Sequence, residues 1–91
     1  MVTLVDFWSS SCTNCQREIP ELEAIYEKYK DYGLVVVGVH SPQQAYERDP
    51  AVVNASIDKL GITYPIAVDS DLETWTDFDN HYWPAQYLAD A

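Results

Sequence analysis

The stretch that decides the fold runs from residue 4 to residue 15 and reads Leu4-Val5-Asp6-Phe7-Trp8-Ser9-Ser10-Ser11-Cys12-Thr13-Asn14-Cys15. Residues 2–8 are mostly β-branched, aromatic or apolar, which predicts a buried strand that carries one acid, Asp6. Three serines then form a polar turn, and from Thr13 onward the apolar residues take up helical spacing. The sequence therefore places a Cys-x-x-Cys motif where a strand ends and a helix begins.

The region after the cysteines alternates between helical and strand patterns. Apolar residues three and four positions apart predict a helix that begins near Thr13 and ends at Gly33. A valine-rich run at 34–39 predicts a central parallel strand. Further expected elements are a helix at 51–60 ended by Gly61, a strand at 64–68, a helix at 71–79 begun by Asp69-Ser70-Asp71, and a strand at 85–89. This βαβαβαβ order predicts an α/β fold with a mostly parallel sheet, flanking helices and right-handed crossovers.

Length and composition fit one small globular domain over residues 1–91. The chain has 91 residues, of which 47% are hydrophobic, so we expect a modest core and no disorder. A net charge of -10 argues against nucleic-acid and anionic-membrane partners, because both need clustered Lys and Arg. No apolar run approaches the roughly 20 residues of a membrane span, and the first residues lack the basic segment of a secretory signal. The sequence itself therefore shows no recognisable targeting signal.

The two cysteines, Cys12 and Cys15, are only three positions apart. A disulfide between them would close almost no loop, so we expect its purpose to be chemistry and not stability. A cysteine at a helix N-terminus faces unpaired N–H groups and the positive end of the helix dipole, which lower its pKa. This predicts Cys12 as the attacking thiolate and Cys15 as the resolving thiol. Two weaker alternatives are that the cysteines are an inert pair in the core or that they form half of a zinc site. A zinc site would need two more ligands, and the available His40 and His81 lack zinc-finger spacing to the cysteines.

The strand that leads into Cys-x-x-Cys resembles the active-site strand and helix of thioredoxins. Pro20, eight residues after Cys12, lies where these proteins carry a proline inside the helix, although proline there costs roughly 3 kcal/mol. Pro84, before the last strand, resembles the superfamily's cis-proline, which faces the cysteine pair. Trp83 and Pro84 are therefore expected to bind substrate. The resemblance implies a thioredoxin-like fold and dithiol–disulfide exchange with protein substrates.

An extra helix and strand at roughly 50–68 restrict the resemblance to certain branches of the thioredoxin superfamily. The segment from Tyr64 to Asp69 resembles the strand inserted in TlpA/ResA-like thioredoxins and in peroxiredoxins. Within that set, three segments are most similar to the soluble domain of DipZ-like proteins, namely Gly38-Val39-His40-Ser41-Pro42, Tyr46 to Pro50 and Tyr82-Trp83-Pro84-Ala85. The family's last hairpin strand and helix are absent from residues 1–91, which implies a C-terminally incomplete domain. The strand at 85–89 would then offer an edge for pairing with another molecule.

The DipZ-like resemblance also carries expectations about setting and partners. That family fuses a membrane electron-transfer module to an extracytoplasmic thioredoxin-like domain. It implies a bacterial periplasm or cell envelope, protein thiol or disulfide substrates, and a membrane thiol reductant of the CcdA type as a partner. The chain shows no signal, so a cytoplasmic location stays open. No metal and no cofactor beyond the redox-active disulfide are implied.

The resemblance assigns roles to three residues around the cysteines. Asp6 matches the buried acid behind the pair, which accepts a proton from Cys15 because desolvation raises a carboxylate's pKa. Glu18 matches an acid near the site in ResA-like proteins. Trp8 matches a tryptophan that packs beside the active-site loop and contacts substrate.

Several positions depart from the family, and two other functions stay open. Ser11 stands where many members have Trp, and Thr13-Asn14 is neither the Gly-Pro of reducing thioredoxins nor the Pro-His of strong oxidants, so the direction of electron flow stays open. One alternative is a thiol peroxidase, although Ser9 takes the place of the threonine in its usual Thr-x-x-Cys signature. The other is a copper- or haem-handling chaperone, although copper chaperones on this fold prefer Cys-x-x-x-Cys, which is one residue longer. Residues interpreted as structural or groove-lining are His40, Trp75 and His81.

Overall fold

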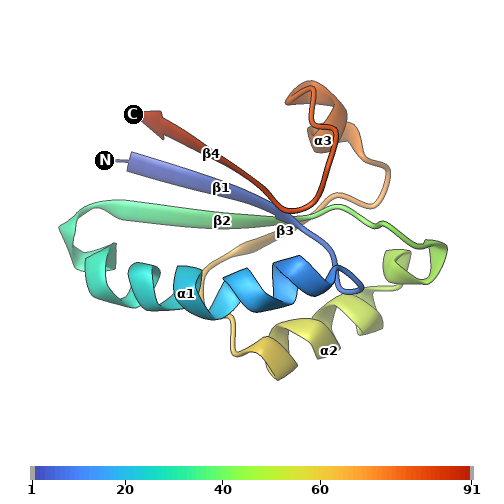
Figure 1. Ribbon diagram of the computed structural model, residues 1–91, viewed down its shortest axis with the longest axis horizontal. Helices are drawn as coiled ribbons and strands as arrows, with labels where there is room; N and C mark the ends of the chain where they lie inside the picture. The colour runs from blue at the N-terminus through green and yellow to red at the C-terminus, as the bar shows by residue number, and fades with distance from the viewer. Residues whose placement is uncertain (1, 91) are drawn as a thin grey trace.

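Four strands form one sheet in the structure, a computed structural model that describes residues 2–90 (Figure 1). In chain order the elements are β1 (Val2–Trp8), α1 (Thr13–Tyr29), η1 (Lys30–Tyr32), β2 (Leu34–His40), η2 (Ala45–Arg48), α2 (Pro50–Leu60), β3 (Ile66–Val68), α3 (Glu73–Asp77) and β4 (Ala85–Asp90). Helices α1 and α2 lie on one side of the sheet and α3 on the other. Residues 1 and 91, the ends of the expected domain, lie outside the described residues.

The strand order is β3-β2-β1-β4. β1 pairs in parallel with β2, and β2 with β3, whereas β4 runs antiparallel to β1. This confirms the thioredoxin-like fold and the mostly parallel sheet. In this register Asp6 lies between Gly38 of β2 and Gln86 of β4. Within residues 2–90, the outer edge of β4 has no strand partner.

The long first helix begins as predicted but ends earlier. α1 stops at Tyr29, and the chain tightens into the short 3-10 turn η1 before Gly33, which adopts φ 96°. Such tightening is common at helix C-termini because it satisfies otherwise unpaired carbonyl groups. Pro20 lies inside α1, and Gly61 ends α2 with φ 67°, as expected.

Two elements are shorter than predicted. The strand expected at 64–68 covers only Ile66–Val68, because Pro65 has no N–H to donate. The helix expected at 71–79 covers only Glu73–Asp77, because Leu72 before it and Asp79 after it take left-handed conformations that a helix cannot include. The N-cap residue is Leu72, whose side chain makes no capping hydrogen bond; the Asp69 carboxylate instead accepts the backbone N–H groups of Thr74 and Trp75 at 2.9 and 3.0 Å.

The core is divided by the sheet. On the α1 side, Trp8 and Cys15 belong to a buried cluster completed by Cys12, Ile19, Leu22, Val36, Ile62 and Tyr64. On the α3 side, Phe7 and Val39 pack with Ala85, Trp75 and Tyr87. The cysteine pair is thus built into the larger part of the core. Nowhere in residues 2–90 is a helix both long and apolar enough to cross a membrane.

Candidate active site

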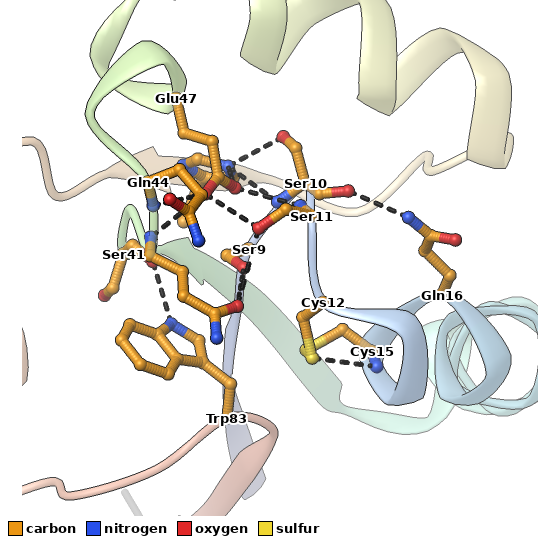
Figure 2. A network of polar contacts seen from close by, with 12 residues as sticks. Ser9, Ser10, Ser11, Cys12, Cys15, Gln16, Ser41, Gln44, Glu47 and Trp83 are labelled. Carbon is orange, nitrogen blue, oxygen red and sulfur yellow. Dashed lines mark hydrogen bonds and ion pairs between the residues drawn. A yellow bond between two sulfur atoms is a disulfide. The ribbon is translucent and has the colours of Figure 1, made fainter.

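Cys12 and Cys15 form a disulfide at the start of α1, with their Cα atoms 5.2 Å apart (Figure 2). Cys12 is the N-cap residue, and its Sγ accepts the backbone N–H of Cys15 at 3.2 Å. The first turn of α1 carries no acidic side chain whose negative charge would offset the positive end of the helix dipole at Cys12. Cys12 is 9% exposed and Cys15 is 1% exposed, so Cys12 is the more accessible residue of the pair.

Asp6 lies on the same side of the sheet as the cysteines and is completely buried. Neither of its carboxyl oxygens has a hydrogen-bond partner among the described residues. The pKa of Asp6 is raised to about 8, mainly by burial and also by the neighbouring Glu18, while the Gln86 amide acts in the opposite direction. The group therefore changes its charge in the pH range where thiols also titrate.

Gln86 links the expected acids but was not among the residues expected from the sequence. It lies opposite Asp6 in the β1–β4 pairing, and its side-chain N–H donates to Glu18 Oε1. The structure thus brings Asp6 and Glu18 together with an amide from the last strand. A known antiparallel register would have revealed Gln86, since the residue opposite a buried acid is a natural candidate to contact it.

Trp8 and Trp83, the two tryptophans expected to contact substrate, pack in the same core cluster as the cysteines. Trp8 is buried beside the cysteines and packs edge-on against His40, with ring centroids 4.8 Å apart. Trp83 is half-buried, and its indole N–H donates to the Ser41 carbonyl at 2.8 Å (Figure 2). The Trp83–Pro84 peptide bond is cis, as expected from the resemblance.

His40 contacts the three-serine turn directly. It is fully buried, and its Nε2 accepts the backbone N–H of Ser10 at 3.1 Å, with Ser10 Oγ at 2.9 Å. Burial lowers its pKa, with Glu47 acting in the opposite direction, so the ring is neutral at pH 7. By contrast, His81 is exposed and lies 3.4 Å from an Asp79 oxygen. His40 is therefore a structural residue of the active-site turn.

Glu47 is a buried acid that sequence reasoning missed. Its Oε1 accepts the Ser11 backbone N–H at 3.0 Å and its Oε2 accepts the Ser11 hydroxyl at 2.9 Å. Oε2 also accepts the backbone N–H groups of Gln43 and Gln44, at 3.1 and 2.7 Å. A charged residue in a polar stretch is normally expected to be exposed to solvent, so no local feature of the sequence predicted the burial of Glu47.

No group of three or more His, Cys, Asp or Glu side chains within residues 2–90 is arranged to hold a metal ion. The redox-capable group in the described part of the chain is the Cys12–Cys15 disulfide itself. A disulfide at the start of the helix that follows a buried strand, with a buried acid behind it, defines a thioredoxin-fold protein with a Cys-x-x-Cys redox centre.

The chain belongs to the AhpC/TSA family, whose sequence model matches residues 1–91. It is 53% identical over 90 residues to protein DipZ of Mycobacterium tuberculosis (strain CDC 1551 / Oshkosh), across 99% of the chain and 13% of DipZ. It is 40% identical over 88 residues to the thiol-disulfide oxidoreductase YkuV of Bacillus subtilis (strain 168), across 97% of the chain and 59% of YkuV.

A solved solution structure of a thioredoxin-like protein in the oxidised form is also similar. It matches with a TM-score of 0.89 and 39% identity, over 98% of the chain and 60% of that protein. These similarities confirm the expected TlpA/ResA-like and DipZ-like resemblance. The chain spans less than two thirds of each of these three proteins.

Proposed function

We propose that this chain exchanges a dithiol for a disulfide with protein substrates through Cys12 and Cys15. The observation that carries the proposal is the position of the disulfide at the N-terminus of α1, where Cys12 Sγ accepts a helix N–H group. Such a position stabilises a thiolate, which is the nucleophile in disulfide exchange. The similarity to YkuV, a thiol-disulfide oxidoreductase, supports the same chemistry.

In the reducing direction, the reaction moves two electrons from the chain to its substrate. The Cys12 thiolate attacks one sulfur of a substrate disulfide, and the other substrate sulfur leaves as a thiolate. The Cys15 thiol then gives its proton to the Asp6 carboxylate and attacks Cys12 Sγ. The second substrate thiolate is released and the Cys12–Cys15 disulfide forms. The raised pKa of Asp6 suits this step, because a general base works best when its pKa lies near the operating pH.

We assign supporting roles to the other expected residues. Glu18 adjusts the pKa of Asp6, to which its own carboxyl group is close enough to contribute. Trp83 and Pro84 bind the substrate segment around the attacked sulfur. Trp8 was also expected to contact substrate, but it is completely buried, so we assign it the support of the turn that carries Cys12. The disulfide is the only redox group that this mechanism needs.

The similarity to DipZ supports an extracytoplasmic setting in a bacterial envelope. There the oxidised chain would be reduced again by a membrane thiol reductant of the CcdA type. These parts of the proposal rest on resemblance, since the chain spans 13% of DipZ. The exposed edge of β4 is the surface at which we place any pairing with a second molecule.

Trapping of mixed disulfides tests the proposed function. Reduced wild-type chain should reduce the disulfides of insulin, and Cys15→Ser should accumulate a covalent adduct because its mixed disulfide cannot be resolved. Cys12→Ser is the matched control and should form little adduct. Failure of the wild type to reduce insulin, together with no adduct for Cys15→Ser, would overturn the proposal.

The same reduced protein separates the two alternative functions. Fast consumption of hydrogen peroxide, well above the rate of an ordinary thiol, would favour a thiol peroxidase. A tight equimolar copper complex that requires both cysteines would favour a metal-handling role. We expect neither result.

A further inference from the structure

The turn before the nucleophile is held by a buried acid that comes from a distant part of the chain. Glu47 is 1% exposed, and its carboxylate accepts four hydrogen bonds from N–H and O–H groups. Two of these donors belong to Ser11, the residue directly before Cys12. Figure 2 shows Glu47 beside the serine turn that leads into the cysteine pair. Any change at Glu47 therefore reaches the backbone of Cys12 through one peptide unit.

Glu47 is ionised in this setting. Burial raises the pKa of its carboxyl group, but the hydrogen bonds from Gln44 and Ser11 outweigh burial and leave the pKa below its ordinary value. All four donors point to the carboxylate oxygens, which leaves no acceptor for a carboxyl proton among these contacts. A negative charge thus lies buried beside the active-site turn.

No cation neutralises this charge within the described residues. Neither Lys nor Arg forms an ion pair with Glu47. His40 Nε2 lies 3.8 Å from Glu47 Oε1, but this nitrogen already accepts the Ser10 N–H and so carries no proton. The charge is balanced by dipoles alone, so its field extends to neighbouring groups.

We propose that Glu47 is a positioning residue for Cys12: it fixes the turn before the nucleophile, and its buried charge makes the Cys12 thiolate less stable than the helix terminus alone would. This inference rests on the proposed function and adds to it a preferred direction of electron transfer. A less stable thiolate makes the dithiol form a better electron donor. The Cys pair is therefore shifted toward reduction of its substrates.

Other titratable groups on the elements around the cysteine pair also influence the titration of Cys12. They are Asp6 on β1, Arg17 and Glu18 on α1, His40 on β2, the buried Tyr64 before β3, and the exposed His81 and Tyr82 before β4. Asp6 and Glu18 act on each other, as described above. Replacing Glu47 also removes its upward effect on the pKa of His40, but that change keeps the His40 ring neutral, so the charge that differs between the variants is that of Glu47.

The test compares Glu47→Gln with two matched variants. Glu47→Gln removes the charge and keeps the shape, whereas Ser11→Ala removes one of the four hydrogen bonds to Glu47 and keeps the charge. Glu73→Gln removes an exposed acid on α3. The Cys12 thiolate is titrated by its absorbance at 240 nm, and the dithiol–disulfide equilibrium is measured against glutathione. Both measurements use the full 91-residue chain.

We expect Glu47→Gln to increase the acid dissociation constant of Cys12 by about three- to tenfold. The equilibrium with glutathione should move toward the dithiol form by a similar factor, while Ser11→Ala and Glu73→Gln should change either quantity by less than about twofold. An unchanged Cys12 titration in Glu47→Gln overturns the proposal, and so does an equal change in all three variants.

A measurement on the wild type keeps the proposal testable if Glu47→Gln does not fold. Carboxyl ¹³C NMR must show Glu47 ionised over the whole range in which Cys12 titrates, and a protonated Glu47 there overturns the proposal. Neither measurement needs a protein substrate. An inactive chain whose Cys12 titration still responds to Glu47→Gln would contradict only the proposed function, and an active chain without that response would contradict only this inference.

Discussion

Asp6 and Gln86 lie directly opposite each other in the antiparallel pairing of β1 with β4. The Gln86 amide also donates to Glu18. One neutral side chain therefore stands between a fully buried acid and a half-buried one. An amide N–H favours the ionised form of a carboxyl group, whereas a neighbouring carboxylate disfavours it. The proton affinity of Asp6 is thus set by burial, by Glu18 and by Gln86 together.

Replacing the two neighbours of Asp6 should move its titration in opposite directions. Gln86→Leu removes the favourable amide and should raise the pKa of Asp6, whereas Glu18→Gln removes a nearby negative charge and should lower it. We expect each midpoint to move by about half a pH unit or more. Carboxyl ¹³C NMR of the oxidised protein measures this directly. Glu21→Gln, an exposed acid on the same helix, is the control, and shifts of the same sign in both variants would contradict the arrangement.

The raised pKa of Asp6 also predicts how stability depends on pH. The folded chain holds the Asp6 proton up to about pH 8, whereas the unfolded chain releases it near the ordinary value of 3.8. Between these values the folded state binds more protons, so its stability falls as pH rises, by up to about 1.4 kcal/mol per pH unit from this group. Asp6→Asn should remove that slope. Urea unfolding of the oxidised protein from pH 4 to 8.5 checks it, and parallel curves for the two proteins would be the contrary result.

The sequence was most informative where the deciding signal is local. The strand at 2–8, the helix start at Thr13 and the stop at Gly61 depend on residues within a few positions of one another, and the structure confirms all three. Asp69 lies within the segment expected to cap the third helix, but the left-handed Leu72 shortened the helix itself. Such a conformation leaves little trace in sequence, because leucine seldom adopts it.

What the sequence missed depends on contacts between distant residues. Glu47 reaches Ser11 across 36 positions, and Gln86 reaches Glu18 across 68. Neither residue differs locally from a solvated polar side chain. Both become part of the site only once η2 folds over the serine turn and β4 pairs with β1. Strand register would therefore have found Gln86, whereas Glu47 is found only once the position of η2 is known.

The hydrogen bond from Ser10 fixes the tautomer of His40. Because the Ser10 N–H donates to Nε2, the single proton of the neutral ring must lie on Nδ1, a buried atom without a partner among the described residues. Two-bond ¹H–¹⁵N NMR should show a protonated Nδ1 and an unprotonated Nε2. Since burial lowers the pKa of His40, the ring should stay neutral below pH 6.5 and the stability that it contributes should decline as pH falls. A proton on Nε2 at pH 7 would contradict the geometry of the turn.

Gly38 allows the rings beneath the active-site turn to approach the sheet, and Gly38→Ala tests how tightly they are packed. A Cβ at this position would lie 2.6 Å from Ile66 Cδ1 and 3.1 Å from both Trp8 Nε1 and Tyr64 Cε1. The end of the Ile66 side chain can rotate away, but the two rings are buried and have little room to move. We therefore expect Gly38→Ala to lower the free energy of unfolding by about 1–3 kcal/mol and to alter the near-UV circular dichroism of Trp8.

Gly61→Ala is the matched control for this prediction. Gly61 adopts φ +67° with no atom near the position of a Cβ, so its replacement should cost about 1–2 kcal/mol from backbone strain alone. Because Gly61 lies at the end of α2 and outside the cluster around Trp8, the near-UV spectrum should stay unchanged. Urea unfolding and near-UV spectra of both variants separate ring displacement from backbone strain. A Gly38→Ala protein with wild-type stability and spectrum would show that Trp8 and Tyr64 can yield, and that the core beneath Cys12 is looser than these distances require.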